Sequence, residues 1–182
     1  AGGPEESVFQ PEFSPDGRYL AYVSDRTGYW QLYVYDLEAG EHVQLTDGPY
    51  EHGRPAWVQG LRTYAFAPDG RSIFYIRSEA GFDSLWRCTL DGRAGRLTPH
   101  NRRIRGPLDD YAGLAQIDVA PGNEPDEARI ACIAQAPHIP PRIVVARVGA
   151  APGREAGADP EARTREEAPI HASTVVIRRS RA

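Results

Sequence analysis

Short hydrophobic runs separated by polar turns follow one another along the chain, and their order recurs. The same pattern of apolar stretch, proline-containing turn and second apolar stretch occurs in FSPDGRYLAYVS, FAPDGRSIFYIR and VAPGNEPDEARIACIA. The turn prolines, Pro15, Pro68 and Pro121, stand 53 residues apart. A regular interval of this length is typical of a repeat architecture in which each repeat forms one small structural unit.

Each repeat contains the pattern of a small antiparallel sheet. In the first two repeats the turn reads Pro-Asp-Gly, in which Pro presets the backbone, Asp caps it and Gly accepts a positive φ. The strand after the turn reads RYLAYVS, RSIFYIR or ARIACIA, and the next strand reads QLYVYDL, SLWRCTL or RIVVARV. The glycine-containing segments EAGE and DGRAG then predict hairpin turns into a fourth strand.

Repeated four-stranded units predict an all-β fold, a partial β-propeller of about three four-stranded antiparallel blades. The blades are expected at about residues 8–46, 57–98 and 115–178 of a single domain, 1–182. The second strand of each repeat, for example residues 20–23, is apolar on both faces, which predicts packing against neighbours on both sides. Residues 149–169 contain only Ala, Gly, Pro, Arg, Glu, Asp and Thr and predict a disordered insertion.

The amino-acid composition argues against nucleic acid and membrane as partners. The net charge is −4 and all 21 basic residues are scattered arginines, so we expect no nucleic-acid partner. No apolar run reaches the roughly 18 residues of a membrane span, so we expect no membrane partner. Methionine is absent, and three blades fall short of the typical four to eight of a closed propeller. We therefore expect the chain to be part of a longer protein.

The chain resembles the propeller of the prolyl oligopeptidase family of serine peptidases, in particular its acylaminoacyl-peptidase and dipeptidyl-aminopeptidase-like members. The resemblance is carried by ESVFQPEFSPDGRYLAYVSDRTGYWQLYVYDL, HGRPAWVQGLRTYAFAPDG, APHIPPRIVVARV and the closing VVIRRS. It covers about residues 5–148 and 171–180. The resemblance implies that a C-terminal α/β-hydrolase domain with a Ser–Asp–His triad follows the propeller, which admits short or unfolded peptide substrates. It also implies a cytoplasmic location.

The chain itself lacks catalytic motifs. None of its serines lies in a Gly-x-Ser-x-Gly elbow, and no HExxH, phosphate-binding or calcium-binding motif is present. We therefore expect no catalytic residue, metal or cofactor in this chain, and no activity from it alone. The five histidines are dispersed and are expected at the surface or at strand edges. Cys88 and Cys132 are expected to be small buried residues outside any disulfide or zinc site.

Glu5 and Glu6 are the candidate substrate-binding residues. Dipeptidyl peptidase IV members of the family have paired glutamates shortly before a propeller strand, and these hold the free amino terminus of a substrate. Two carboxylates can pair with one ammonium group, which is the basis of the assignment. The alternative is a solvated acidic terminus. Two weaker acidic pairs are Asp109–Asp110, in an inter-blade loop, and Glu166–Glu167, in the predicted insertion.

Several alternatives remain open. Tyr29, Trp30 and Tyr33 could form an aromatic wall for a peptide, although packing between blades is the favoured interpretation. A Tol-type periplasmic propeller, acting as a protein–protein interaction module, shares the Pro-Asp-Gly pattern and is the main alternative function. A sugar-processing propeller lyase is a third possibility, but no cluster of His or Gln supports it.

Overall fold

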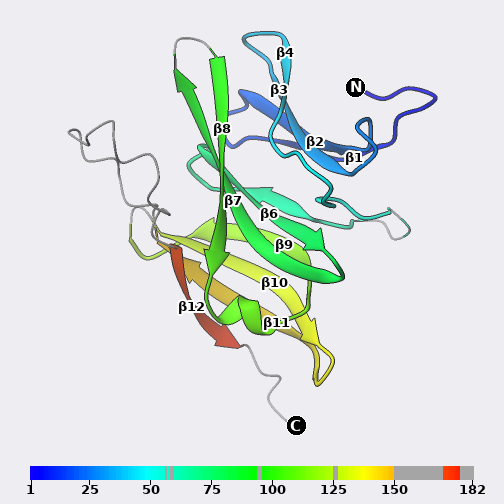
Figure 1. Cartoon of the computed structure of the whole chain (residues 1–182). Helices are drawn as coiled ribbons and strands as arrows, with labels where there is room; N and C mark the ends of the chain where they lie inside the picture. The colour runs from blue at the N-terminus through cyan, green and yellow to red at the C-terminus, as the bar shows by residue number, and fades with distance from the viewer. Residues whose placement is uncertain (56, 58–59, 94–95, 125–126, 150–169, 177–182) are drawn as a thin grey trace, which may run out of the picture.

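The computed structural model describes residues 1–182 except 56, 58–59, 94–95, 125–126, 150–169 and 177–182, and the described part is almost entirely strand (Figure 1). The first sheet contains β1 (Val8–Phe13), β2 (Tyr19–Ser24), β3 (Gln31–Asp36) and β4 (Glu41–Gln44). The second sheet contains β5 (Tyr64–Phe66), β6 (Ser72–Glu79), β7 (Phe82–Arg93) and β8 (Arg96–Arg105). A 3-10 helix, η1 (Pro107–Asp110), precedes the third sheet of β9 (Gly113–Pro121), β10 (Ala128–Ala136), β11 (Ile139–Val148) and β12 (Ile170–Val176).

The three sheets are a partial β-propeller, as the repeats predict. Within each sheet the strands are antiparallel and follow chain order, so the first strand lies at one edge and the fourth at the other. The second and third sheets also touch at their outer edges, where β12 runs parallel to the end of β8 and pairs Ile170 with Ile104. In the described part of the chain, no helix is long and apolar enough to cross a membrane.

The Pro-Asp-Gly turns have the geometry that their residues favour. Gly17 and Gly70 adopt φ values of 72° and 68°, in the left-handed region where a side chain would be strained. The amide of Gly17 donates to the carbonyl of Ser14 at 2.8 Å, which closes the turn. The Asp16 carboxylate accepts hydrogen bonds from the Ser14 hydroxyl at 2.6 Å and from the Arg18 amide at 3.1 Å. These bonds hold the turn that reverses the chain between β1 and β2.

The second sheet supplies the centre of both hydrophobic cores. Alternate residues of β6 face different neighbours: Ile73 and Tyr75 pack against the first sheet, while Phe74 and Ile76 pack against the third. All four side chains are buried. A strand covered on both faces therefore reads as continuously apolar, which is the pattern that predicted this packing.

The third sheet departs from that prediction. In β10 the buried residues alternate with exposed ones, so that Ile130 and Ala134 face the second sheet while Arg129 and Gln135 are exposed. The expectation of an apolar strand on both faces is therefore wrong for this repeat.

The end of the second blade and the predicted insertion can also be compared with the structure. The fourth strand of the second sheet continues beyond Thr98, because the long β7–β8 hairpin keeps pairing to Trp86 opposite Arg103. The predicted disordered insertion at 149–169 lies, apart from its first residue, outside the described residues.

Candidate functional site

The inner edges of the three sheets meet at one polar junction. It consists of two residues of β1, Gln10 and Glu12, two of β9, Gln116 and Asp118, and Arg62, which precedes β5. We call these five residues the inner-strand junction. They come from three different sheets, so their contacts fix how the sheets are placed relative to one another.

Arg62 makes the central contacts of the inner-strand junction. Its guanidinium contacts both carboxylate oxygens of Glu12, at 3.1 and 3.2 Å, and donates through Nε to the carbonyl of Ile117 at 3.2 Å. The Asp118 carboxylate lies 3.8 Å away. The Arg62 side chain is 40% exposed, so this cation joins the three sheets at a surface that water reaches.

The two glutamines satisfy backbone groups of the neighbouring sheet. Gln10 accepts a hydrogen bond from the Thr63 amide at 2.8 Å and donates to the Tyr64 carbonyl at 2.7 Å. Gln116 accepts a hydrogen bond from the Arg62 amide at 2.9 Å. Both glutamines have positive φ values, 50° and 55°, next to irregularities in strand pairing. A bulge of this kind redirects a side chain away from its own sheet.

The strand pattern does not predict the inner-strand junction, although the chain carries a signal for it. Gln10 and Gln116 each stand five residues before a turn proline, and each is followed two residues later by an acid, Glu12 or Asp118. The first and third repeats therefore share a Gln-x-acid motif at the same place. In the second repeat that place is held by Thr63, whose amide is the one that Gln10 binds.

Glu5 and Glu6 have different environments. Glu5 is exposed, whereas the Glu6 carboxylate accepts from the Ser24 hydroxyl and contacts the Arg26 guanidinium, both at 2.7 Å. The hydrogen bond from Ser24, with further bonds from Gly2 and Arg26, lowers the pKa of Glu6 below its ordinary value. Glu6 is therefore ionised and already holds one cation of the chain itself.

The three candidate aromatic residues do not form one wall. Trp30 packs at the first core, edge-on to Phe9 with ring centroids 5.1 Å apart. Tyr33 is buried and stacks on Tyr22 at 5.6 Å on the opposite face of the first sheet, while Tyr29 is exposed. The structure therefore shows the packing alternative for Trp30 and Tyr33.

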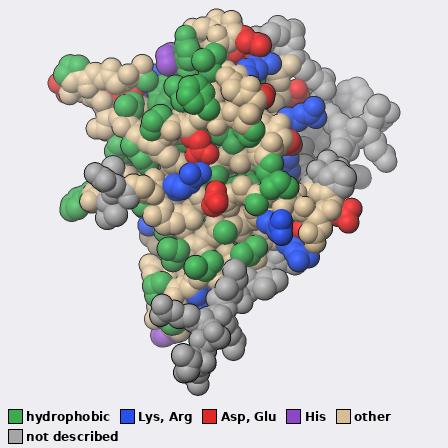
Figure 2. All heavy atoms as spheres, turned by 180° about the vertical axis from the view of Figure 1, so that it is seen from behind, with side chains coloured by type: hydrophobic (Ala, Val, Ile, Leu, Met, Phe, Trp, Pro, Cys, Tyr) green, Lys and Arg blue, Asp and Glu red, His purple; other side chains and the backbone are tan. Residues whose placement is uncertain are grey.

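The face of the first sheet that carries Tyr22 is turned away from the second sheet. A cavity of about 520 Å³ lies there, lined by the following residues: Ala1, Val8, Phe9, Pro11, Leu20, Tyr22, Tyr35 and His42. Figure 2 shows hydrophobic side chains gathered at this end of the molecule. The Tyr22 hydroxyl is hydrogen-bonded to Nδ1 of His42 at 2.8 Å and accepts from Arg26 at 2.9 Å.

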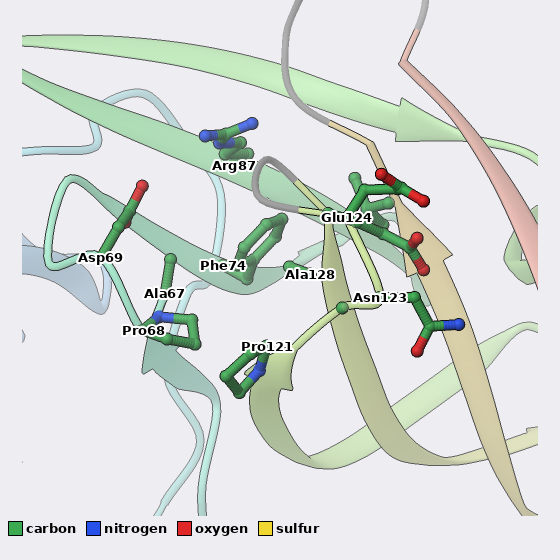
Figure 3. A pocket seen from close by; sticks show the side chains of 12 residues that line it. Ala67, Pro68, Asp69, Phe74, Arg87, Pro121, Asn123, Glu124 and Ala128 are labelled. Atoms are coloured by element: carbon green, nitrogen blue, oxygen red, sulfur yellow. The ribbon is translucent and has the colours of Figure 1, made fainter.

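A second cavity, of about 360 Å³, separates the turns of the second and third sheets (Figure 3). Phe74 lies at its centre, and Asp69 and Glu124 lie on opposite sides of it. At the corresponding place between the first two sheets the turns approach each other, since the Asp16 carboxyl carbon is 3.6 Å from where a Cβ on Gly70 would stand.

His52 and both cysteines are buried. His52 is buried against Tyr75, contrary to the expectation of surface histidines, and this burial lowers its pKa to about 4. Cys88 and Cys132 are unpaired and buried, as expected, and burial raises the pKa of both thiols, to about 12 and about 11. Within the described ranges, no group of three or more His, Cys, Asp or Glu could hold a metal ion.

The weaker acidic pairs have local roles or lie outside the structure. Asp109 accepts from Arg103 at 2.6 Å and from the Gly106 amide at 3.0 Å, and so caps η1. Asp110 is exposed. Glu166 and Glu167 lie outside the described residues.

Parts of the chain are similar in sequence to known peptidases. Residues 3–81 match the model of the dipeptidyl peptidase IV (DPP IV) N-terminal region. The uncharacterized peptidase YuxL of Bacillus subtilis is 44% identical over 82 residues, which are 44% of this chain and 11% of YuxL. Dipeptidyl-peptidase 5 of Porphyromonas gingivalis is 30% identical over 110 residues, which are 58% of this chain and 14% of that protein.

Solved structures agree with these matches. A puromycin-hydrolyzing peptidase of Mycobacterium tuberculosis is 26% identical with a TM-score of 0.60, over 85% of this chain and 20% of that one. A putative TolB from Agrobacterium tumefaciens, 23% identical with a TM-score of 0.50 over 79% of this chain and 46% of that one, shows the shared fold alone. The chain spans about a seventh or less of the length of the curated relatives named above.

The fold and the inner-strand junction define a partial β-propeller module. The two curated relatives and the Mycobacterium tuberculosis protein named above are peptidases. The chain is similar, in sequence and in fold, to the propeller region of peptidases of the prolyl oligopeptidase family.

Proposed function

We propose that this chain is the non-catalytic propeller portion of a serine peptidase, and that it selects short peptide substrates for a C-terminal α/β-hydrolase domain. The observation that carries the proposal is the polar inner edge formed by three adjacent blades in a chain whose relatives are peptidases. Selection works by exclusion: an extended peptide fits along the propeller axis, whereas a folded protein is too wide.

The strand topology indicates which face of the propeller the hydrolase domain would cover. Each sheet has four antiparallel strands, so its first strand begins and its fourth strand ends on the same face of the propeller. The β2–β3, β6–β7 and β10–β11 connections lie on this face too. A hydrolase domain that follows β12 would therefore cover this face and receive peptides that pass along the axis.

Glu5 and Glu6 belong to this proposal as the candidate holders of a substrate ammonium group. Both precede β1 and therefore lie on the same face. Glu5 is exposed and supplies the open carboxylate, while Glu6 is kept ionised and oriented by Ser24 and Arg26. Replacement of Glu5 by Gln would then raise KM for peptides with a free amino terminus and leave KM for amino-blocked peptides unchanged.

The test uses the complete gene product and the 182-residue chain side by side. A fluorophosphonate probe is expected to label the complete product and not the chain, because the nucleophilic serine lies in the hydrolase domain. Short fluorogenic peptides are expected to be cleaved, and the same cleavage sequence within a folded protein is expected to resist. A gene that continues beyond Ala182 with further blades, without a Gly-x-Ser-x-Gly elbow, would favour the Tol-type binding module and contradict the proposal.

A further inference from the structure

The inner-strand junction places one cation between two copies of the same acidic motif. The Gln-x-acid motif occurs at Gln10–Glu12 and again at Gln116–Asp118, and Arg62 lies between them. Nothing in the shape of an isolated blade requires this arrangement, since each sheet already pairs its own strands. The motif therefore serves the spacing between sheets.

Three backbone groups at the entry to β5 depend on other sheets for their partners. The amides of Arg62 and Thr63 donate to glutamine side chains of the third and first sheets, and the Tyr64 carbonyl accepts from Gln10. The Tyr64 hydroxyl also donates to the carbonyl of Gln10. Buried backbone groups that lose such partners are costly, so this segment favours one relative position of the three inner strands.

The guanidinium of Arg62 adds directional contacts to both neighbours. It faces both oxygens of Glu12 and, through Nε, bonds the main chain of β9 at Ile117. The planar guanidinium can do both at once because its donors point in fixed directions, which a lysine ammonium cannot reproduce. Its 40% exposure places the charge at the inner surface and not within a core.

We propose that Arg62 is a positioning residue that fixes the inner strands of the three blades at one spacing and so sets the width of the axial passage. The spacing part of this proposal stands on the contacts alone. The consequence for peptide passage rests on the proposed function.

The first experiment measures amide hydrogen exchange in the complete gene product. In Arg62→Gln, exchange in segments 8–13, 62–66 and 113–121 is expected to rise about tenfold, since local opening becomes easier. Arg62→Lys should give a smaller rise because it keeps the charge. Arg71→Gln is the matched control, since Arg71 is an exposed arginine directly before β6 of the same blade, and it should leave these segments unchanged. Unchanged exchange in Arg62→Gln would overturn the proposal.

Glu12→Gln keeps the test decisive if Arg62→Gln does not fold. This variant removes the charge that Arg62 contacts at 3.1 Å while it preserves side-chain size, and it should raise exchange in the same three segments. An exchange pattern identical to that of the unaltered protein would count against Arg62 as the determinant of spacing.

A second experiment tests the consequence for passage. For Arg62→Gln, kcat/KM for long peptides relative to short ones is expected to rise several-fold, with kcat/KM for the shortest peptide unchanged. Faster exchange with an unaltered length preference would show that the junction does not set the passage width, and would overturn that part. Absence of any peptidase activity in the unaltered product would refute the proposed function and leave the exchange result interpretable.

Discussion

The outer faces of the first and third sheets differ, although both are turned away from the second sheet. On the first sheet that face carries Tyr22, only 5% exposed, stacked on Tyr33 and bordered by a cavity. On the third sheet the equivalent face carries Ile133 at 39% exposure, together with Arg129 and Gln135. Tyr22 on the outer face of the first sheet is therefore buried, whereas Ile133 on the outer face of the third contacts water. Aromatic side chains on the outer face of a sheet can thus be buried without a covering sheet when other side chains, here Arg26 and His42, pack on them.

The largest expected difference is in the stability lost when one side chain on each outer face is replaced by alanine. Tyr22→Ala should lower the free energy of unfolding by about 3 kcal/mol, since it removes a buried ring, its stack on Tyr33 and its bond to His42. Ile133→Ala should cost about 1 kcal/mol or less, because that side chain already contacts water. Urea unfolding monitored by circular dichroism gives both values. Equal losses would show that the two faces are equivalent.

The pH dependence of stability tests whether His52 is buried where the first sheet packs on the second. His52 lies between the first and second sheets with a pKa lowered by burial to about 4, whereas Arg105, at the same place in the next repeat, is exposed. The unfolded chain binds a proton at His52 near pH 6.5 and the folded chain does not. Stability from this group is therefore complete above pH 6.5 and declines by about 3 kcal/mol as the pH falls to 4.

The variant His52→Phe isolates this contribution. It keeps an aromatic ring against Tyr75 and removes the titrating group, so its stability should fall less steeply between pH 6.5 and 4. His100→Gln, at an exposed position, should retain the full pH dependence. Parallel pH profiles for the unaltered chain and His52→Phe would contradict the buried, neutral histidine.

The smallest expected difference lies in the turns. Asp16→Ala should cost about 1 kcal/mol, because the carboxylate accepts from the Ser14 hydroxyl and the Arg18 amide. Asn123→Ala, in the exposed turn of the third sheet, should change stability by less than about 0.5 kcal/mol. Thermal unfolding of the two variants distinguishes them. A larger cost for Asn123→Ala would mean that the third turn is the better ordered of the two.

The repeat pattern was sufficient to predict the blades, because strand periodicity and Pro-Asp-Gly turns are local properties of the sequence. The prediction for β10 is wrong because the segment ARIACIAQA is rich in apolar residues, yet only one of its faces is buried. Ala131 is small and only half-buried, and Arg129 and Gln135 are exposed to water. The repeat pattern also missed the inner-strand junction. Arg62 and the glutamines act between sheets, and only their positions relative to the turn prolines revealed a shared place in the repeat.

His52 was misjudged for a related reason. A histidine in a connection between sheets has no periodic neighbours from which burial could be predicted. Its ring is enclosed by Tyr75 of the second sheet, and its amide donates to the Trp30 carbonyl of the first. Burial of this kind depends on how two sheets meet, which the local pattern does not contain.

The connection between β11 and β12 determines where the chain can take up additional residues. Val148 and Ile170 flank it on the propeller face where the short Pro-Asp-Gly turns also lie, opposite the face from which the sheets begin and end. Because Val148 and Ala172 are paired neighbours, the sheet closes whatever number of residues is accommodated between them. Residues added at this place would therefore lengthen the chain without disturbing the strand ends on the opposite face.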